Sequence, residues 1–180
     1  METEQQLLKA IYNGERAALR RLYDRYSGYA TAIVLRYITE QEEVRDVLQD
    51  SFMKILTSVG NFSYRGEGSL KNWVSRVVVN ESISHLRMQQ RAVFTDDIPD
   101  MPDEELPDIK DIPPDLLAEM VERLPDNYRT VLNLFVVEEH SHREIARQLG
   151  MKESTSSSLF FRAKKKLAKM IKEYQNDDTT

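Results

Sequence analysis

An acidic, Pro-rich segment in the middle of the chain sets the strongest limit on how it can fold. The segment is AVFTDDIPDMPDEELPDIKDIPP, and residues 92–115 hold nine acidic residues and one basic residue, a net charge of −8. It has no sustained apolar periodicity, so it cannot bury enough surface to offset the entropy lost on ordering. We therefore expect a linker over residues 93–112 between two small domains, residues 1–92 and 113–180. An ordered loop within a single domain is the alternative.

Both flanks of the linker have helical apolar spacing, and no convincing alternating strand pattern appears. The pattern predicts helices over 15–38, 40–58, 69–91, 114–123, 126–138, 142–149 and 154–173. Thr39 and Glu42 fit a capping box for the second of these, and Ser69 is positioned to cap the third. The stretch NFSYRGEGS, residues 61–69, is expected to be a loop. The predicted fold class is all-α.

Composition excludes several classes of function. The chain has no cysteine, which excludes disulfides and cysteine-ligated metals. No apolar run approaches the ~20 residues of a membrane span, and the N-terminus lacks the features of a signal peptide, so we expect a cytoplasmic protein. His140 and His142 are two residues apart, which puts them on different faces of any helix. With no nucleophile paired to a base and no spaced metal ligands, we expect no enzyme activity, no cofactor and no metal.

The sequence SHREIARQLGMKESTSSSLFFRAKKKL has the layout of a helix-turn-helix. Ser141 and Glu144 fit a capping box, Ala146 is small where two helices approach, and Gly150 suits a left-handed helix end. A second helix then begins, and such a helix enters the major groove of DNA. Its expected buried stripe is Ser156, Phe160, Ala163, Leu167 and Met170. Thr155, Ser158, Arg162, Lys165, Lys166 and Lys169 are expected mainly on the exposed side. A solvated helix face with cations near its C-terminus is the alternative interpretation.

The helix expected over 69–91 has a polar and basic face. Its members are Asn72, Arg76, Asn80, Ser84, Arg87 and Arg91. The preceding loop adds Phe62, Tyr64 and Arg65. Aromatic rings beside cations suit single-stranded nucleic acid, because bases stack on the rings while cations meet phosphates. The alternative is that Phe62 and Trp73 are core residues and the polar stripe is merely hydrated.

Two sets of motifs resemble the bacterial extracytoplasmic-function (ECF) sigma factors of RNA polymerase. RRLYDRYSGYA, VRDVLQDSFMKI and LKNWVSRVVVNESISHLRMQQR are similar to the family's region 2, with Trp73, Asn80 and Arg87 at the family's spacing. LPDNYRTVLNLFVVEEHSHREIARQLGMKESTSSSLFFRAKKKL is similar to region 4. The two motifs occur in the family's order, on either side of a linker that varies within the family.

The resemblance implies a role for each domain and names three sets of residues. Region 2 would bind core RNA polymerase through Val44, Asp46, Gln49, Asp50 and Met53. It would recognise and melt the −10 element through Phe62, Tyr64, Arg65, Lys71, Asn72, Arg76, Asn80, Ser84, Arg87 and Arg91. Region 4 would bind the −35 element through Arg143, Lys152, Ser154, Thr155, Ser157, Ser158, Arg162, Lys165 and Lys166. The implied partners are core polymerase and promoter DNA, with an anti-sigma factor as a further candidate.

The recognition helix departs from the family pattern at positions where members carry Lys and Arg. Here those positions hold Ser157 and Leu159. Because Arg or Lys to guanine is the commonest specific base contact, we expect only modest −35 specificity. Two alternatives to a sigma factor remain at this point: a conventional helix-turn-helix regulator that binds duplex DNA without polymerase, and a helical interaction protein without DNA function.

Overall fold

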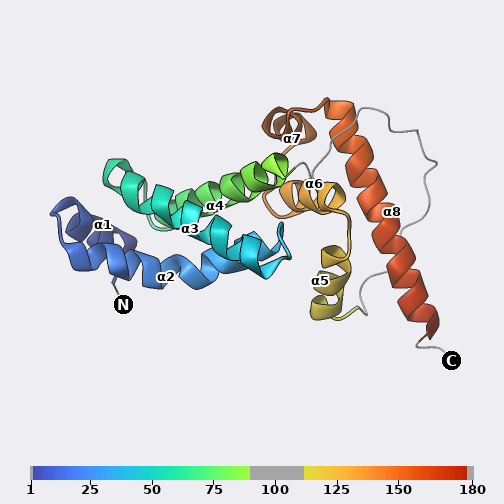
Figure 1. The fold of residues 1–180 in the computed structure, drawn as a ribbon, viewed down its shortest axis with the longest axis horizontal. Helices are drawn as coiled ribbons and strands as arrows, with labels where there is room; N and C mark the ends of the chain where they lie inside the picture. Colours follow the sequence, from blue (N-terminus) through green and yellow to red (C-terminus); the bar gives the residue numbers. More distant parts are fainter. Residues whose placement is uncertain (1, 90–111, 178–180) are drawn as a thin grey trace. The chain divides into compact units, whose positions relative to one another are not determined.

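The computed structural model describes residues 2–89 and 112–177, and these residues are helical with no strand among them (Figure 1). The all-α prediction is therefore confirmed. The chain divides into two compact units, residues 1–85 and 86–180. Most of the segment expected to be a linker lies outside the described residues. Within the described ranges, no helix combines the length and the apolarity that crossing a bilayer demands.

The N-terminal unit is built from four α-helices and one short 3-10 helix. They are α1 (Glu4–Tyr12), α2 (Arg16–Leu35), α3 (Gln41–Ser58), η1 (Val59–Asn61) and α4 (Ser69–Met88). Sequence analysis did not predict α1, although Thr3 and Gln6 form a complete capping box at its start. Gly14, with φ of 79°, lies in the turn between α1 and α2.

Two of the predicted helix caps are wrong. The N-cap of α3 is Glu40, without a side-chain capping bond, so the capping box expected from Thr39 and Glu42 does not form. The helix begins at Gln41, which leaves Thr39 one residue too far out. Glu42 still lies in the first turn, where a carboxylate is favourable beside the helix dipole. Ser69 is the first residue of α4 instead of preceding it, and its hydroxyl accepts from the Arg65 amide at 3.2 Å.

The core of the N-terminal unit takes residues from each of its α-helices. Among the buried side chains are Leu7, Leu8, Leu22, Ile33, Val34, Val47, Ile55, Leu70, Val74 and Val78. Tyr37 and Ile38 follow the end of α2 and are also buried. Burial of a Leu or Ile side chain stabilises the fold by roughly 1.5–3 kcal/mol. This shared core therefore fixes the helices on either side of the loop between η1 and α4.

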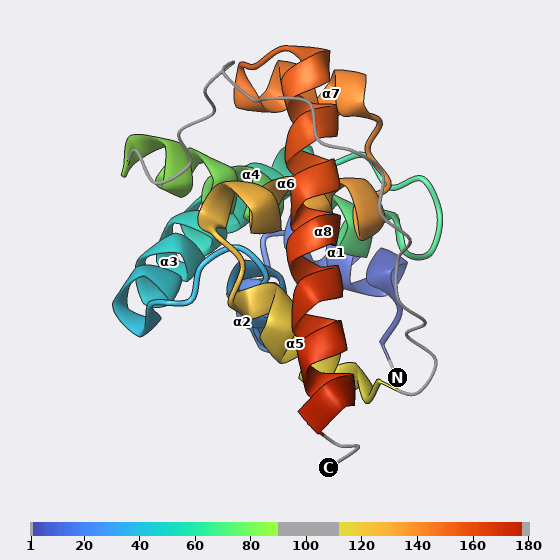
Figure 2. The same cartoon turned by 90° about the vertical axis from the view of Figure 1, so that its right-hand side faces the viewer.

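The C-terminal unit contains α5 (Pro114–Glu122), α6 (Asp126–Val136), α7 (His142–Leu149) and α8 (Glu153–Asp177). Figure 2 shows α7 at the start of α8 and α5 along its second half. The predicted capping box of Ser141 and Glu144 is present, and Gly150 is left-handed with φ of 70°. Both signals of the helix-turn-helix are therefore confirmed.

The C-terminal core begins earlier than the predicted linker boundary allows. Ile112, assigned to the linker, is buried in a cluster with Met120 and Ile171. A second cluster holds Leu124, Leu132 and Ala163. Ile112 is the apolar residue just before Pro113, and its burial anchors the start of α5 against α8.

Candidate functional site

A pocket lies where the loop before α4 meets the first turns of that helix. It has a volume of about 420 Å³ and is lined by Asn61, Phe62, Ser63, Arg65, Ser69, Asn72, Trp73 and Arg76. We call it the loop pocket. The rings of Phe62 and Trp73 meet with centroids 5.3 Å apart at 41°. Both rings are half-buried, so each serves the core and also presents a surface to the pocket. The rim is polar and carries two arginines.

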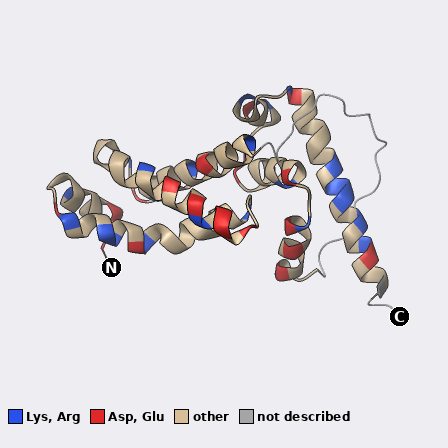
Figure 3. Ribbon diagram, in the orientation of Figure 1, with Lys and Arg blue, Asp and Glu red and all other residues tan. Residues whose placement is uncertain are grey.

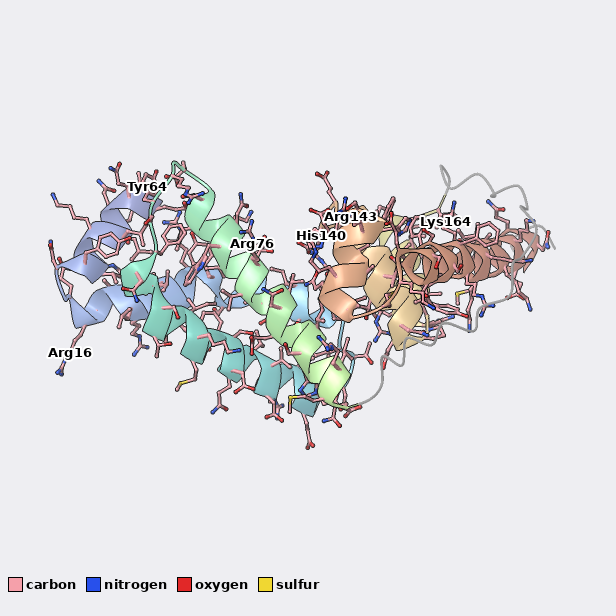
Figure 4. All side chains as sticks on the ribbon, turned by 90° about the horizontal axis from the view of Figure 1, so that it is seen from above. Arg16, Tyr64, Arg76, His140, Arg143 and Lys164 are labelled. Atoms are coloured by element: carbon pink, nitrogen blue, oxygen red, sulfur yellow. The ribbon has the colours of Figure 1, made fainter. Side chains whose placement is uncertain are left out.

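The polar face of α4 is exposed as predicted. Five of its residues are exposed, and we call them the α4 stripe: Asn72, Arg76, Asn80, Ser84 and Arg87. Arg91 lies outside the described residues. Figure 4 shows Tyr64 on the loop beside the start of α4 and Arg76 further along the helix. The loop pocket therefore opens beside a row of polar and cationic side chains, a combination suited to a base and its phosphates.

Three further predicted contact residues are Tyr64 and Arg65 on the loop and Lys71 on α4. Arg65 and Lys71 are exposed, and Tyr64 is half-buried. The ammonium of Lys71 lies 4.7 Å from the ring centroid of Tyr29, a cation–π contact. Desolvation raises the pKa of Tyr64, and the Glu67 carboxylate 3.4 Å away raises it further. The Tyr64 hydroxyl therefore stays protonated and can donate a hydrogen bond.

A second pocket lies between α2 and α3. We call it the α2–α3 groove, and it has a volume of about 380 Å³. Its lining residues are Tyr23, Ser27, Thr31, Arg45, Leu48, Gln49, Phe52, Met53 and Leu56. Met53 is 61% exposed and Tyr23 46% exposed, so the groove presents apolar side chains to the surface.

The predicted contact set on α3 is partly wrong. Asp46, Gln49, Asp50 and Met53 are exposed, but Val44 is 7% exposed and belongs to the core. Val44 follows the same apolar spacing as Val47 and Phe52, so it points inward with them. Val44 is therefore withdrawn as a surface contact.

The front of α8 alternates between exposed and buried hydroxyls. Ser154 and Ser157 are exposed and Ser158 is half-buried, whereas Thr155 is 4% exposed and Ser156 fully buried. Thr155 was predicted to face DNA, and that prediction is wrong because its side chain turns into the helix-turn-helix core. Leu159 is also buried, at 3% exposure. Its position therefore does not face the DNA groove, and the lack of a cation there removes no groove contact.

A histidine fastens α7 to α8. The Nδ1 atom of His142 lies 3.0 Å from the Ser156 hydroxyl, and its ring stacks on Phe135 with centroids 4.5 Å apart at 19°. Phe160 completes the aromatic cluster, 4.4 Å from Phe135. Desolvation lowers the pKa of His142 against a smaller opposing effect of Glu153, so the neutral ring is the favoured form. This contact accounts for the buried serine that sequence analysis placed in an apolar stripe.

The middle of α8 carries a cationic surface. Arg162, Lys165, Lys166, Lys169 and Lys172 line a trough of about 700 Å³ together with Tyr128. We call it the α8 trough, and Figure 3 shows Lys and Arg gathered along this part of the helix. Lys164 lies on another side of α8, where it lines a different, apolar pocket and stacks its ammonium 5.3 Å from the Phe160 centroid. The remaining predicted residues of this unit, Arg143 and Lys152, are exposed.

Sequence analysis missed several residues of these sites. Glu4 and Tyr12 come from α1 and bond the loop before α4. Tyr23 and Arg45 line the α2–α3 groove, and Lys172 lines the α8 trough. The capping box at the start of α1 was the one signal that could have revealed Glu4 as helical. Among residues 2–89 and 112–177, no group of three or more acidic or histidine side chains is placed to hold a metal ion.

Comparison with known proteins finds two regions of one family, one in each half of the chain. Residues 22–92 match the model for sigma-70 region 2, and residues 115–167 match the model for sigma-70 region 4. Similar proteins include the RNA polymerase sigma-H factor of Pseudomonas aeruginosa, 26% identical over 94% of each chain. The ECF RNA polymerase sigma-E factor of Haemophilus influenzae is 27% identical over 94% of this chain and 95% of the relative.

Among solved structures, CnrH in complex with the cytosolic domain of CnrY aligns with 96% of this chain and 99% of that one, at 20% identity and a TM-score of 0.48. The two family matches occur in sequence order and together span 124 of the 180 residues, 71 in region 2 and 53 in region 4. The exposed α4 stripe lies within the first match, and the helix-turn-helix lies within the second. The chain therefore belongs to the sigma-70 family, and its relatives include ECF sigma factors.

Proposed function

We propose that this protein is an ECF-type sigma factor, which binds core RNA polymerase and directs transcription initiation at specific promoters. The observation that carries the proposal is the pair of sigma-70 matches, region 2 then region 4, on two separate helical units. Each unit has an exposed surface suited to one part of that task. Such a factor works on chromosomal DNA, so we expect it in the bacterial cytoplasm.

Core polymerase binds the N-terminal unit at the α2–α3 groove. Met53 and Tyr23 supply exposed apolar surface, and a few such anchors dominate the energy of a protein interface. Asp46, Gln49 and Asp50 surround them with polar and acidic groups that set orientation and association rate. In the free protein the apolar side chain of Met53 is in contact with water, which is unfavourable. Burial against polymerase would remove this surface from water and favour binding.

The −10 element is recognised and melted by the loop pocket and the α4 stripe. Extruding a base from the stack costs a few kcal/mol, so a pocket that exists before DNA binds lowers the cost of capture. Phe62 and Trp73 offer ring surface, and Asn72 offers hydrogen bonds to a base edge. The contacts proposed for the single strand are Phe62, Tyr64, Arg65, Lys71, Asn72, Arg76, Asn80, Ser84 and Arg87.

The −35 element is bound by the helix-turn-helix with α8 as the recognition helix. The contacts proposed there are Arg143, Lys152, Ser154, Ser157, Ser158, Arg162, Lys165 and Lys166. Phosphate contacts from the cations fix the position of the helix, and the three serines supply short hydroxyl contacts to bases. The burial of Leu159 means that only Ser157 replaces a family cation at an exposed position. We therefore expect −35 specificity to depend partly on DNA shape.

Run-off transcription with purified core polymerase on genomic fragments tests the proposal. New start sites that appear only when this protein is added establish the sigma function and give the promoter motif. If the protein shifts duplex DNA but leaves core polymerase inactive, the conventional regulator is the correct interpretation.

A matched pair of arginine variants tests the role of the α4 stripe in the same assay. Arg76→Gln should reduce open-complex formation about tenfold, because a charge-assisted contact is worth roughly 1.5–3 kcal/mol. Arg20→Gln removes the same charge from α2, where Arg20 is 86% exposed and pairs with Asp24 at 3.8 Å. Equal losses in both variants would contradict a specific contact at Arg76.

A further inference from the structure

The carboxylate of Glu4 is buried on α1 and reaches across the N-terminal unit to the start of α4. Glu4 is 2% exposed. Its Oε2 atom accepts from the amides of Gly68 at 2.9 Å and Leu70 at 3.1 Å, and its Oε1 atom accepts from the Lys71 amide at 3.0 Å. The Tyr26 hydroxyl adds a fourth bond, to Oε1 at 2.9 Å. A side chain 64 to 67 residues away in sequence is thus tied to three backbone amides within residues 68–71, at the start of α4.

These bonds replace the missing cap of α4. The first amides of a helix have no partner within the helix, and a side chain just before the helix usually supplies one. Here Gly68 stands at that place and has no side chain. Glu4 supplies the acceptor oxygens instead, and its negative charge lies at the positive end of the helix dipole. The loop before α4 can therefore carry Gly66 and Gly68, with φ of 115° and 87°, without losing the helix start.

Helix α1 also holds the beginning of the loop before α4. The Tyr12 hydroxyl, at the last residue of α1, donates a hydrogen bond to the carbonyl of Phe62. Residues 62 to 68 are thus tied to α1 at both ends, and the lining residues Phe62, Ser63 and Arg65 come from this stretch. Neither Tyr12 nor Glu4 lines the pocket, so their effect on the pocket acts through the backbone that they hold.

We propose that α1 is a brace for the loop pocket, with Glu4 as the positioning residue that presets the pocket for base capture and Tyr12 as its second tie. The proposal rests on the proposed sigma function and adds a residue that touches no DNA. A braced pocket loses little conformational entropy on capture, because the loop is ordered before the base arrives. Loosening the brace should therefore slow melting of duplex DNA and spare steps that need no base extrusion.

The brace can be tested without polymerase, using Glu4→Gln and the matched control Glu2→Gln. Glu2 pairs with Arg21 on α2 at 3.3 Å and makes no bond to the loop. A carboxamide removes the charge and presents an N–H₂ group toward amide donors, so the Leu70 and Lys71 amides should exchange hydrogen about tenfold faster or more. Trp73 is the single tryptophan of the chain, and its acrylamide quenching should rise. Unchanged exchange and quenching in Glu4→Gln would overturn the proposal.

Promoter templates test the function of the brace. With holoenzyme, Glu4→Gln should form open complexes about tenfold more slowly on duplex promoter DNA, but within about twofold of wild type on a template already unpaired at the −10 element. Core affinity should not change. Equal losses on both templates, or a loss of core affinity, would reduce Glu4 to a general structural residue and overturn the proposal.

A second variant keeps the test decisive if Glu4→Gln does not fold. Tyr12→Phe removes one hydroxyl from a side chain that is 48% exposed, so it should fold normally. It should show the same duplex-specific defect at a smaller size, about threefold, and equal rates to wild type would overturn the brace. If the wild-type protein itself gives no open complex, the sigma function fails, while the hydrogen-exchange result still judges the brace.

Discussion

The two neighbouring lysines Lys164 and Lys166 should differ in their effect on the salt dependence of promoter binding. Lys166 is exposed and lines the α8 trough, whereas Lys164 lines a separate apolar pocket and stacks on Phe160. Each neutralised phosphate contributes about −0.9 to the slope of log Kobs against log salt concentration. Replacing Lys166 by Gln should therefore make the slope about 0.9 less negative, and replacing Lys164 should leave it nearly unchanged.

The difference is large enough to measure by anisotropy of labelled promoter DNA with holoenzyme. Raising salt fourfold, from about 50 to about 200 mM, should weaken the Lys166→Gln complex about 3.5-fold less than the wild-type complex. The two variants lose the same charge on the same helix, so any effect of net charge alone appears equally in both. Equal slopes for the two variants would refute the assignment of the α8 trough to phosphate contact.

Three further predictions concern the groove, the core and pH. Met53→Asp should weaken core polymerase binding at least about tenfold in a fluorescence titration, while Met88→Asp, at an 83% exposed position, should not. Arg129 is 3% exposed and bonds two backbone carbonyls, so Arg129→Met should lower the free energy of unfolding by about 3 kcal/mol in urea, against under about 0.5 for Arg123→Met. Burial lowers the pKa of His142, so the unfolded chain binds its proton more readily, and stability should fall as pH drops through about 6.5. His142→Gln should remove a slope of at most about 1.4 kcal/mol per pH unit, and an unchanged slope would contradict this reasoning.

Local signals predicted much of the C-terminal unit because α5, α6 and α7 each carry a start or stop signal in their own sequence. Pro114 and Asp126 open α5 and α6, and the capping box of Ser141 and the left-handed Gly150 bound α7. These are interactions between residues a few positions apart, which a sequence displays directly. The predicted α8 stops short of its end at Asp177, since nothing after residue 173 breaks the helical pattern.

The errors concern interactions that depend on distant residues. Thr155 is a residue type usually found at the surface, but in the packed C-terminal unit its side chain is only 4% exposed. Val44 fits both an apolar stripe and a family contact set, and only the packed structure decides between them. The role of Glu4 was invisible in the sequence because the three amides that it accepts hydrogen bonds from lie more than 60 residues away. A charged residue at a helix start ordinarily faces solvent, so its burial could not be anticipated.

The alternation of hydroxyls at the front of α8 separates what the helix recognises from what holds it in place. Thr155, Ser156 and Leu159 are buried, while Ser154, Ser157 and Ser158 retain contact with solvent. If the −35 contacts are as proposed, substitutions at the three outward serines should change base preference at little cost to folding. Over evolutionary time this surface can drift toward new promoters one residue at a time. The same three positions are a small set to vary when engineering sigma factors that do not act on each other's promoters.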